Sequence, residues 1–240
     1  MGEAYCKLYV SFGTKGFTVD ECGRVLGGRR ESVRVLMSRL ASAGYADRIR
    51  RGEYQLVHPD EIVLGVSGAL APLHEIRQRE YVPILRRMLV ELMGAFRDRL
   101  ASVVLFGSIA RGRAHPFSDV DVLVVVDGMP ESLSDRAREF SGINRRLHNE
   151  RMKLWKRKGI YANIEFIPFS REEAGILRAL YLDAALDSIV LFDRDGFMGA
   201  VLERLRRRLR EMGARRIELP DGSWYWRLRP KVRRGEVVSL

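Results

Sequence analysis

Cysteine and the amide residues are scarce in this chain of 240 residues. The two cysteines, Cys6 and Cys22, do not provide a disulfide framework and lack the spacing of metal ligands. We therefore expect reduced thiols in a cytoplasmic protein. Few thermolabile amides and 30% charged residues fit a thermophile, although a GC-rich genome would favour arginine as well. The amide residues are Gln55, Gln78, Asn144, Asn149 and Asn163.

Long apolar runs are absent as well. Because no window of about 18 residues is free of charge and apolar throughout, we expect no membrane-spanning helix and no membrane partner. The first ten residues, MGEAYCKLYV, are charged and lack the hydrophobic region of a signal peptide. A hydrophobic fraction of 46% is typical of a globular protein.

Positive charge is abundant and unevenly distributed. The formal net charge is +11, and residues 204–234 contain eleven Arg and one Lys against three acidic residues. Apolar residues at helical spacing predict a helix over residues 196–213, with its arginines turned outward or sideways. This arginine cluster is either a solvated surface or an electrostatic footprint for nucleic acid or another polyanion.

The most informative stretch is residues 104–126, VLFGSIARGRAHPFSDVDVLVVV. Asp119 and Asp121 stand at the start of an apolar run that reads as a strand. Strand residues two apart project from one face, so the two carboxylates would lie side by side. Their repulsion favours a cation between them, and hard oxygen ligands suit Mg²⁺ or Mn²⁺. The alternative is a surface turn followed by a metal-free acidic strand.

Gly107 and Ser108 end another apolar run, and ten residues separate Ser108 from Asp119. A glycine lets the backbone approach a phosphate closely, and N–H groups at the start of a helix attract anions. A phosphate cradle close to a metal-binding carboxylate pair predicts phosphoryl or nucleotidyl transfer.

Together these motifs resemble the nucleotidyltransferase fold of the DNA polymerase β superfamily. GSIARG followed by SDVDVLVV is similar to its minimal members, which include antitoxin-type proteins paired with small helical toxins. The resemblance implies a metal-dependent transfer of a nucleoside monophosphate from a nucleoside triphosphate, ATP in the first place, to an acceptor hydroxyl. It assigns catalysis and metal binding to Asp119 and Asp121. It assigns nucleotide binding to Gly107 and Ser108. Arg111 follows this pair closely, and we expect it to bind the nucleotide as well by steadying the leaving phosphates.

The same resemblance requires a third carboxylate on a later strand. Residues 160–167, IYANIEFI, read as a strand in which Glu165 lies between two apolar residues. The resemblance therefore adds Glu165 to the catalytic and metal-binding residues, although the family more often has Asp at this position. Alternatively, Glu165 faces solvent or forms an ion pair with Arg111 or Arg113.

The first 66 residues resemble a winged helix-turn-helix domain. Thr18 and Glu21 have the spacing of a capping box at the start of one helix. A second helix would end near Gly44, and two short strands flank Gly52. The resemblance implies DNA or RNA binding, and the alternative is dimerisation or protein contact. The arginines proposed for nucleic-acid contact are Arg29, Arg30, Arg34, Arg50 and Arg51.

We therefore predict an α/β (α+β) chain in three parts. A winged helix-turn-helix over residues 1–66 is followed by a connecting helix over 67–100. A nucleotidyltransferase domain with a mixed sheet flanked by helices occupies 101–240 and ends in a helix and a hairpin. The sequence does not identify the acceptor of the nucleotide, which is a protein such as a toxin, an RNA 3′ end or a small molecule. The alternative function is a DNA-binding regulator or antitoxin whose nucleotidyltransferase fold serves mainly partner recognition.

Overall fold

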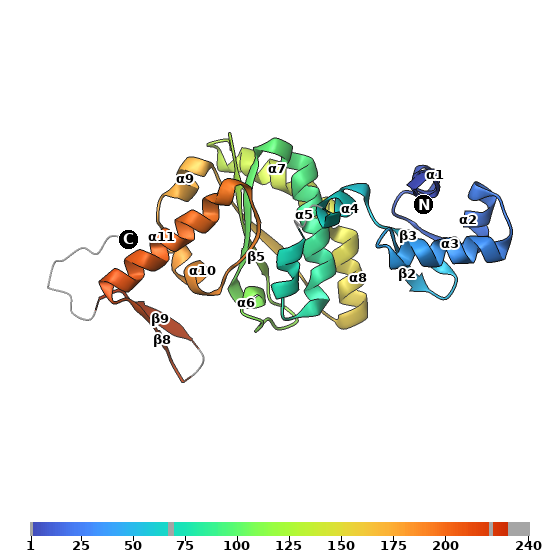
Figure 1. The fold of residues 1–240 in the computed structure, drawn as a ribbon. Coiled ribbons are helices and arrows are strands. Elements are labelled where there is room, and N and C mark those ends of the chain that lie inside the picture. The colour runs from blue at the N-terminus through green and yellow to red at the C-terminus, as the bar shows by residue number, and fades with distance from the viewer. Residues whose placement is uncertain (1, 67–69, 221–222, 230–240) are drawn as a thin grey trace. The chain divides into compact units, whose positions relative to one another are not determined.

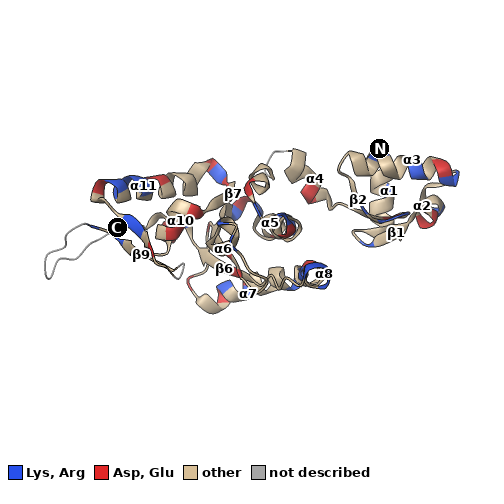
Figure 2. Ribbon diagram, turned by 90° about the horizontal axis from the view of Figure 1, so that it is seen from below, with Lys and Arg blue, Asp and Glu red and all other residues tan. Residues whose placement is uncertain are grey.

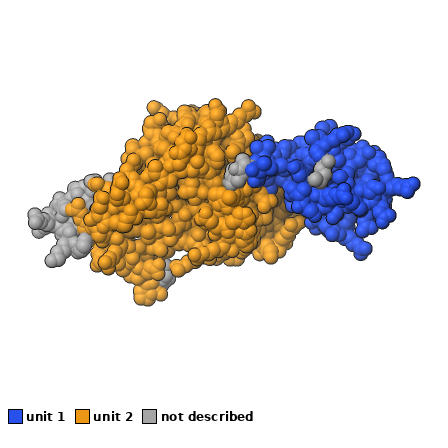
Figure 3. Space-filling model, in the orientation of Figure 1, with its two compact units in different colours: residues 1–68 blue, residues 69–240 orange. Residues whose placement is uncertain are grey.

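The computed structural model describes residues 2–66, 70–220 and 223–229, so parts of the expected segments 67–100 and 101–240 lie outside the described residues. The chain divides into two compact units, residues 1–68 and 69–240, which are coloured separately in Figure 3. In the described ranges, no helix has both the length and the apolar character needed to cross a membrane.

Unit 1 contains helices packed on a three-stranded antiparallel sheet with the strand order β1-β3-β2. Its core is built from apolar side chains of α1, α2, α3 and the sheet, among them Leu8, Phe17, Met37 and Leu56. The elements are α1 (Gly2–Phe12), β1 (Gly16–Thr18), α2 (Val19–Leu26), α3 (Arg30–Ser42), β2 (Ala46–Arg50), β3 (Glu53–Leu56) and α4 (Pro59–Val66).

Local signals in the sequence set the ends of these elements. The predicted capping box is present at the start of α2, where the Glu21 N–H donates to Thr18 Oγ1 at 3.2 Å. In return, the Thr18 N–H donates to the Glu21 carboxylate at 2.7 Å. Gly44 follows α3 and Gly52 joins β2 to β3, each with φ of +79°, a conformation that favours glycine. The capping box and both glycine predictions are confirmed.

Unit 2 is built around a four-stranded mixed sheet. Its elements are η1 (Ala71–Glu75), η2 (Arg79–Tyr81), α5 (Val82–Phe96), η3 (Arg97–Arg99), β4 (Leu100–Phe106), α6 (Gly107–Ala110), β5 (Val120–Val126), α7 (Leu133–Arg146), α8 (His148–Lys158), β6 (Ile164–Phe169), α9 (Arg171–Gly175), α10 (Tyr181–Asp187), β7 (Ile189–Asp193), η4 (Arg194–Gly196), α11 (Phe197–Met212), β8 (Arg215–Glu218) and β9 (Trp224–Arg227). The last two strands form the expected C-terminal hairpin.

The strand order in the main sheet is β6-β5-β4-β7. β4 runs antiparallel to β5 and β7, and β5 runs parallel to β6. Helices α5, α7 and α8 cover one face, and α9, α10 and α11 cover the other (Figure 1). Burial on both faces explains why β4 and β5 are almost continuously apolar in sequence. The predicted mixed sheet flanked by helices is confirmed.

One expected strand begins later than predicted. The segment expected over 160–167 forms β6 only from Ile164, and it continues to Phe169. Before β6, the Tyr161 N–H donates to the Pro116 carbonyl, and the Asn163 carbonyl accepts from the Val120 N–H, both at 2.7 Å. The first bond joins the segment to the loop before β5, and the second joins it to Val120, the first residue of β5.

The arginine-rich helix expected over 196–213 is α11, whose apolar stripe is buried on the sheet. Several of its arginines, seen in blue in Figure 2, have structural partners. Arg206 donates to the Ala185 carbonyl at 2.7 Å, and Arg210 pairs with Glu203 at 3.0 Å. Part of the positive charge in this region therefore holds α11 in place.

An ion pair between a buried arginine and a half-buried glutamate joins α7 to the start of α9. The Arg136 side chain is almost fully buried and donates two hydrogen bonds to the Glu173 carboxylate, at 2.8 and 2.9 Å. Glu173 also accepts from the Ser170 N–H at 2.8 Å in the capping box of α9. The hydrogen bond from Arg136 is the largest cause that lowers the pKa of Glu173. The pair therefore fixes the end of β6 against α7.

We predict that Glu173→Ala lowers the free energy of unfolding of unit 2 by about 2–3 kcal/mol, because the Arg136 guanidinium stays buried without its partner. The pKa of Glu173 is lower in the folded chain than in the unfolded chain, where it is about 4.3. Its contribution to stability is therefore present at neutral pH and is lost as the pH falls from the unfolded-state pKa through the folded-state pKa. Urea unfolding at pH 7 and at acid pH measures both effects. Glu131→Ala, an exposed position before α7, is the control; equal midpoints for the two variants would contradict the assignment.

Candidate active site

Three carboxylates predicted from the sequence lie at one edge of the main sheet. In the parallel pairing of β5 and β6, Asp121 stands opposite Glu165, and in the antiparallel pairing of β4 and β5 it stands opposite Phe106. Asp119 lies just before β5 and is exposed, as is Glu165, whereas Asp121 is half-buried. The neighbouring starts of β5 and β6 therefore bring the carboxylates together.

The electrostatics of this edge favour a cation. Burial raises the pKa of Asp121 above its ordinary value, and the negative charge of Asp119 raises it as well. Arg111 lowers the pKa of Asp121, and Glu165 adds a smaller rise. The site thus holds more negative charge than its own arginine neutralises, which is the condition under which a bound cation stabilises a carboxylate cluster.

Gly107 lies directly against Asp121. Its φ of +72° favours glycine, and a Cβ at this position would lie 1.9 Å from Asp121 Oδ2. No other residue type fits here without moving the carboxylate. Ser108 and Ile109 follow in α6, so the Gly-Ser motif and the Asp-x-Asp motif form one contact at the end of β4.

Asn163 is a site residue that the sequence analysis missed. Its Nδ2 donates to Asp119 Oδ1 at 3.1 Å and so orients that carboxylate. The signal was available in the sequence, because Asn163 and Glu165 are two residues apart and share a side in the IYANIEFI segment.

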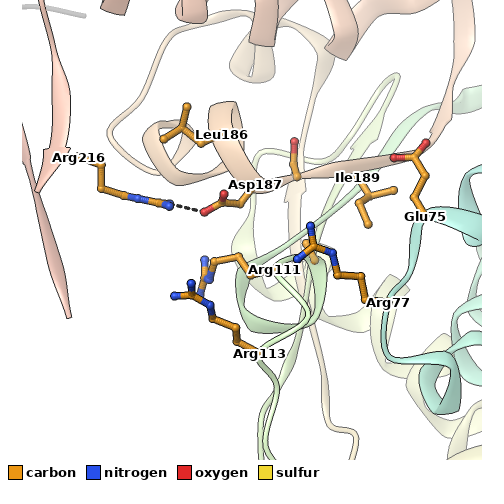
Figure 4. Close-up of a pocket in the computed structure, with 10 residues that line it drawn as sticks. Glu75, Arg77, Arg111, Arg113, Leu186, Asp187, Ile189 and Arg216 are labelled. Carbon is orange, nitrogen blue, oxygen red and sulfur yellow. Dashed lines mark hydrogen bonds and ion pairs between the residues drawn. The ribbon is translucent and has the colours of Figure 1, made fainter. Parts of the chain in front are cut away.

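A basic pocket of about 310 Å³ adjoins the C-terminal end of α6 on the β7 side of the sheet. Figure 4 shows the guanidinium groups of Arg77, Arg111 and Arg113 gathered toward the middle of the pocket, with Arg216 entering from β8. The remaining lining residues are Glu75, Ala110, Leu186, Asp187, Ser188 and Ile189. Four arginines against two acidic residues make this pocket suited to an anion with several negative charges.

Two of these arginines come from segments outside the sequence motif. Arg216 is paired with Asp187 and lies over the Trp224 ring, 5.4 Å from its centroid. Arg111 lies over the same ring at 4.6 Å. The aliphatic part of Arg77 packs on Gly112, where a Cβ would come within 2.9 Å of Arg77 Cδ. No local pattern in the sequence marks Arg77 or Arg216 as neighbours of Arg111.

A metal ion bound at Asp119 and Asp121 would need further ligands from a substrate. Among the residues that the structure describes, no group of three or more His, Cys, Asp and Glu side chains is arranged to hold a metal ion. Asp119 and Asp121 nevertheless supply the hard oxygen ligands that suit Mg²⁺, which is usually held by one or two carboxylates together with substrate phosphates. The side chains present therefore fit a metal that is shared with a nucleotide.

The arginines proposed for nucleic-acid contact in unit 1 are all exposed. Arg29 and Arg30 lie at the start of α3, Arg34 lies within it, and Arg50 and Arg51 lie at the turn between β2 and β3. Arg30 pairs with Asp20 at 3.0 Å, and Arg50 pairs with Glu53.

Two solved structures were compared with this chain, one of a toxin-antitoxin with AMP-PNP and one of a toxin-antitoxin MntA-HpeT mutant. They are 15% and 14% identical to it in sequence. Each match covers 52% of this chain and 90% of the other, with a TM-score of 0.31. A TM-score of this size does not establish a shared fold.

The sequence comparisons are more informative. The profile of the nucleotidyltransferase domain family matches residues 88–179. Two proteins of Methanocaldococcus jannaschii, each named "Putative protein adenylyltransferase" (MJ1305 and MJ0141), are also similar. The first is 31% identical over 125 residues, which cover 51% of this chain and 79% of that protein. The second is 41% identical over 51 residues, which cover 21% of this chain and 52% of that protein. Since the match to MJ1305 spans most of that relative, and the family profile covers both motifs of the site, the chain belongs to the nucleotidyltransferase family and is a nucleotidyltransferase.

Proposed function

We propose that unit 2 transfers a nucleoside monophosphate from a nucleoside triphosphate, ATP in the first place, to an acceptor hydroxyl in a metal-dependent reaction. The observation that carries this proposal is the contact of Asp121 with Gly107, with Asp119 and Glu165 beside it. It joins a carboxylate site to the turn that would receive phosphates. The names of the two relatives support adenylyl as the transferred group.

The metal would be Mg²⁺ or Mn²⁺, held by Asp119 and Asp121 together with phosphate oxygens of the nucleotide, and Glu165 is proposed as a further ligand. Its chemistry would be to neutralise charge on the phosphates and to lower the pKa of the acceptor hydroxyl. Asn163 supports this assignment because its hydrogen bond orients Asp119.

The phosphates would be bound by the turn at Gly107 and by basic residues on the β7 side of the sheet. Ser108 and the backbone beside Gly107 lie next to Asp121, and Arg111 follows at the end of α6. The pocket that contains Arg111 also contains Arg77 and Arg216, so it can take the β- and γ-phosphates that become pyrophosphate.

In the reaction, the acceptor oxygen forms a bond with the α-phosphorus while the bond from this phosphorus to the bridging β-phosphate oxygen breaks. Pyrophosphate leaves toward the arginine pocket, where the guanidinium groups stabilise its charge. Glu165 is exposed beside Asp121 and serves the attacking hydroxyl, whose proton it can accept.

A second candidate function is a DNA-binding regulator or antitoxin. We propose that unit 1 is a winged helix, supported by the order of α2, α3 and the β2–β3 hairpin and by the exposed arginines at α3 and at the hairpin turn. In this case α3 would be the recognition helix and the hairpin the wing. The regulator and the enzyme are compatible activities of one chain, because each uses a different unit.

The first prediction tests the carboxylate pair. The double variant Asp119→Ala, Asp121→Ala should lose Mg²⁺-dependent binding of a non-hydrolysable ATP analogue by about 100-fold or more, since both carboxylate ligands of the metal are removed. Calorimetric titration with Mg²⁺ and with a chelator measures the metal-dependent part. Asp135→Ala, on the surface of α7, is the control. Metal-dependent binding that survives in the double variant would refute the site.

The second prediction separates binding from chemistry. Glu165→Gln should change the affinity for the nucleotide by about twofold or less but slow transfer by about 100-fold or more, because it serves the attacking side. Single-turnover transfer of label from α-labelled ATP to a cell extract gives the rate. Glu211→Gln, exposed at the end of α11, is the matched control. If Glu165→Gln transfers at the wild-type rate, Glu165 has no part in the reaction.

The third prediction concerns unit 1. Binding of a labelled DNA duplex should weaken linearly on a log–log plot against salt, and the double variant Arg34→Glu, Arg51→Glu should abolish it at physiological salt. Fluorescence anisotropy measures the affinity. The control Arg207→Glu, Arg210→Glu carries the same charge change on α11. Loss of duplex binding in that control alone would assign the DNA contact to α11 instead. Absence of duplex binding in the wild type would reject DNA binding by unit 1.

A further inference from the structure

Three aromatic side chains lie exposed beside the carboxylate site. Phe117 is 67% exposed, Tyr161 is 51% exposed and Trp155 is 40% exposed. The Trp155 ring lies 6.3 Å from Phe117 and 6.2 Å from Tyr161, measured between centroids. We call these three residues the aromatic patch. Neither the nucleotide nor the metal assigned above uses it.

The aromatic patch is built by the same backbone bonds that delay the start of β6. The Tyr161 N–H donates to the Pro116 carbonyl at 2.7 Å, which brings Tyr161 next to the loop that carries Phe117. Trp155 then meets the Tyr161 ring edge to face, with an interplanar angle of 89°. The rings are thus held in place before any ligand arrives, which reduces the entropic cost of binding.

The aromatic patch lies on the opposite side of the carboxylates from the arginine pocket. Phe117 is two residues before Asp119, and Tyr161 is two residues before Asn163, whose amide contacts Asp119. The segment with Phe117 leads into β5, and the segment with Tyr161 leads into β6. The arginine pocket, in contrast, is lined by the start of β7. Since β6 and β7 are the two edges of the sheet, the patch and the pocket flank the site from opposite directions.

The last turn of α8 adds positive charge next to the aromatic patch. Lys156, Arg157 and Lys158 are consecutive and exposed, and within the described chain none of them has an ion-pair partner. Lys158 and Arg151 stand three residues after and four residues before Trp155, so they share its face of the helix. Lys and Arg segments of α8 are blue in Figure 2.

We propose that the aromatic patch and the last turn of α8 bind a single-stranded nucleic acid. Exposed rings stack on successive bases, and neighbouring lysines and arginines neutralise the phosphates between them. A peptide would use the rings but not a row of free cations unless it were acidic. The base of the nucleotide substrate would not need these cations, because its own phosphates have the arginine pocket.

This inference deepens the proposed function and, for its catalytic consequence, rests on it. A strand seated on the rings would end beside Asp119, so that its terminal ribose hydroxyl becomes the acceptor. Transfer would then extend the strand by one nucleotide and release pyrophosphate, as in the reaction described above.

The test uses the full chain and a labelled 12-nucleotide RNA of mixed sequence, without ATP. Trp155→Ala and the triple variant Lys156→Glu, Arg157→Glu, Lys158→Glu should each weaken binding by about tenfold or more. Tyr225→Ala, at an exposed aromatic of β9, is the control and should bind as the wild type does. Quenching of Trp155 fluorescence, absent in Trp155→Phe, would report stacking directly.

Other outcomes distinguish the alternatives. RNA binding that is absent in the wild type, or unchanged in Trp155→Ala and in the charge variant, overturns the proposal. If Trp155→Ala instead weakens binding of the ATP analogue, the rings hold the nucleotide base. If it lowers only transfer to protein, the rings dock a protein acceptor. Either result overturns the nucleic-acid proposal. RNA binding is measured without ATP. A failure to bind RNA would therefore not affect the proposed function, which the Asp119 and Asp121 variant tests separately. Duplex DNA binding should be unchanged by these variants, which separates this surface from unit 1.

Discussion

The chemistry that we propose for unit 2 depends on the close approach of the Asp121 carboxylate to the backbone of Gly107. A side chain at residue 107 would occupy the position of the carboxylate oxygen, and its φ of +72° would also be strained. The register that sets Asp121 opposite Phe106 creates this contact, because the chain turns from β4 into α6 at that point. The turn at Gly107, which we propose binds phosphates, and the carboxylate site therefore cannot move independently.

Charge is arranged around this contact in a definite order along the sheet. Negative charge is concentrated at the ends of β5 and β6, where burial raises the pKa of Asp121 and Asp119 adds to the rise. Guanidinium groups gather toward β7, in the pocket next to α6. The aromatic patch and the exposed cations in the last turn of α8 lie toward β6. Arg111 lowers the pKa of Asp121, but burial and the charge of Asp119 outweigh it, so a cation would stabilise the charged form of Asp121.

Much of the remaining positive charge is structural. Arg136 is buried against Glu173, and Arg206 fastens α11 to the Ala185 carbonyl, whereas Arg210 pairs with Glu203 within α11. A count of arginines in the sequence therefore overstates the surface that is available to nucleic acid. The exposed arginines of α3 and of the β2–β3 turn, and the last turn of α8, are better placed for this purpose.

The sequence by itself determined the features that follow from local spacing. The apolar run after Asp119 predicted a strand, and the period of two placed Asp119 and Asp121 on one face of it. Gly44 and Gly52 predicted a helix end and a turn, and Thr18 with Glu21 predicted a capping box, because each depends on residues a few positions apart. Only the tertiary structure decided that Arg77 and Arg216 share a pocket with Arg111, and that Phe117, Trp155 and Tyr161 form one patch. Their segments are distant in the chain, and each group meets only because the fold brings its segments together, the pocket toward β7 and the patch toward β6.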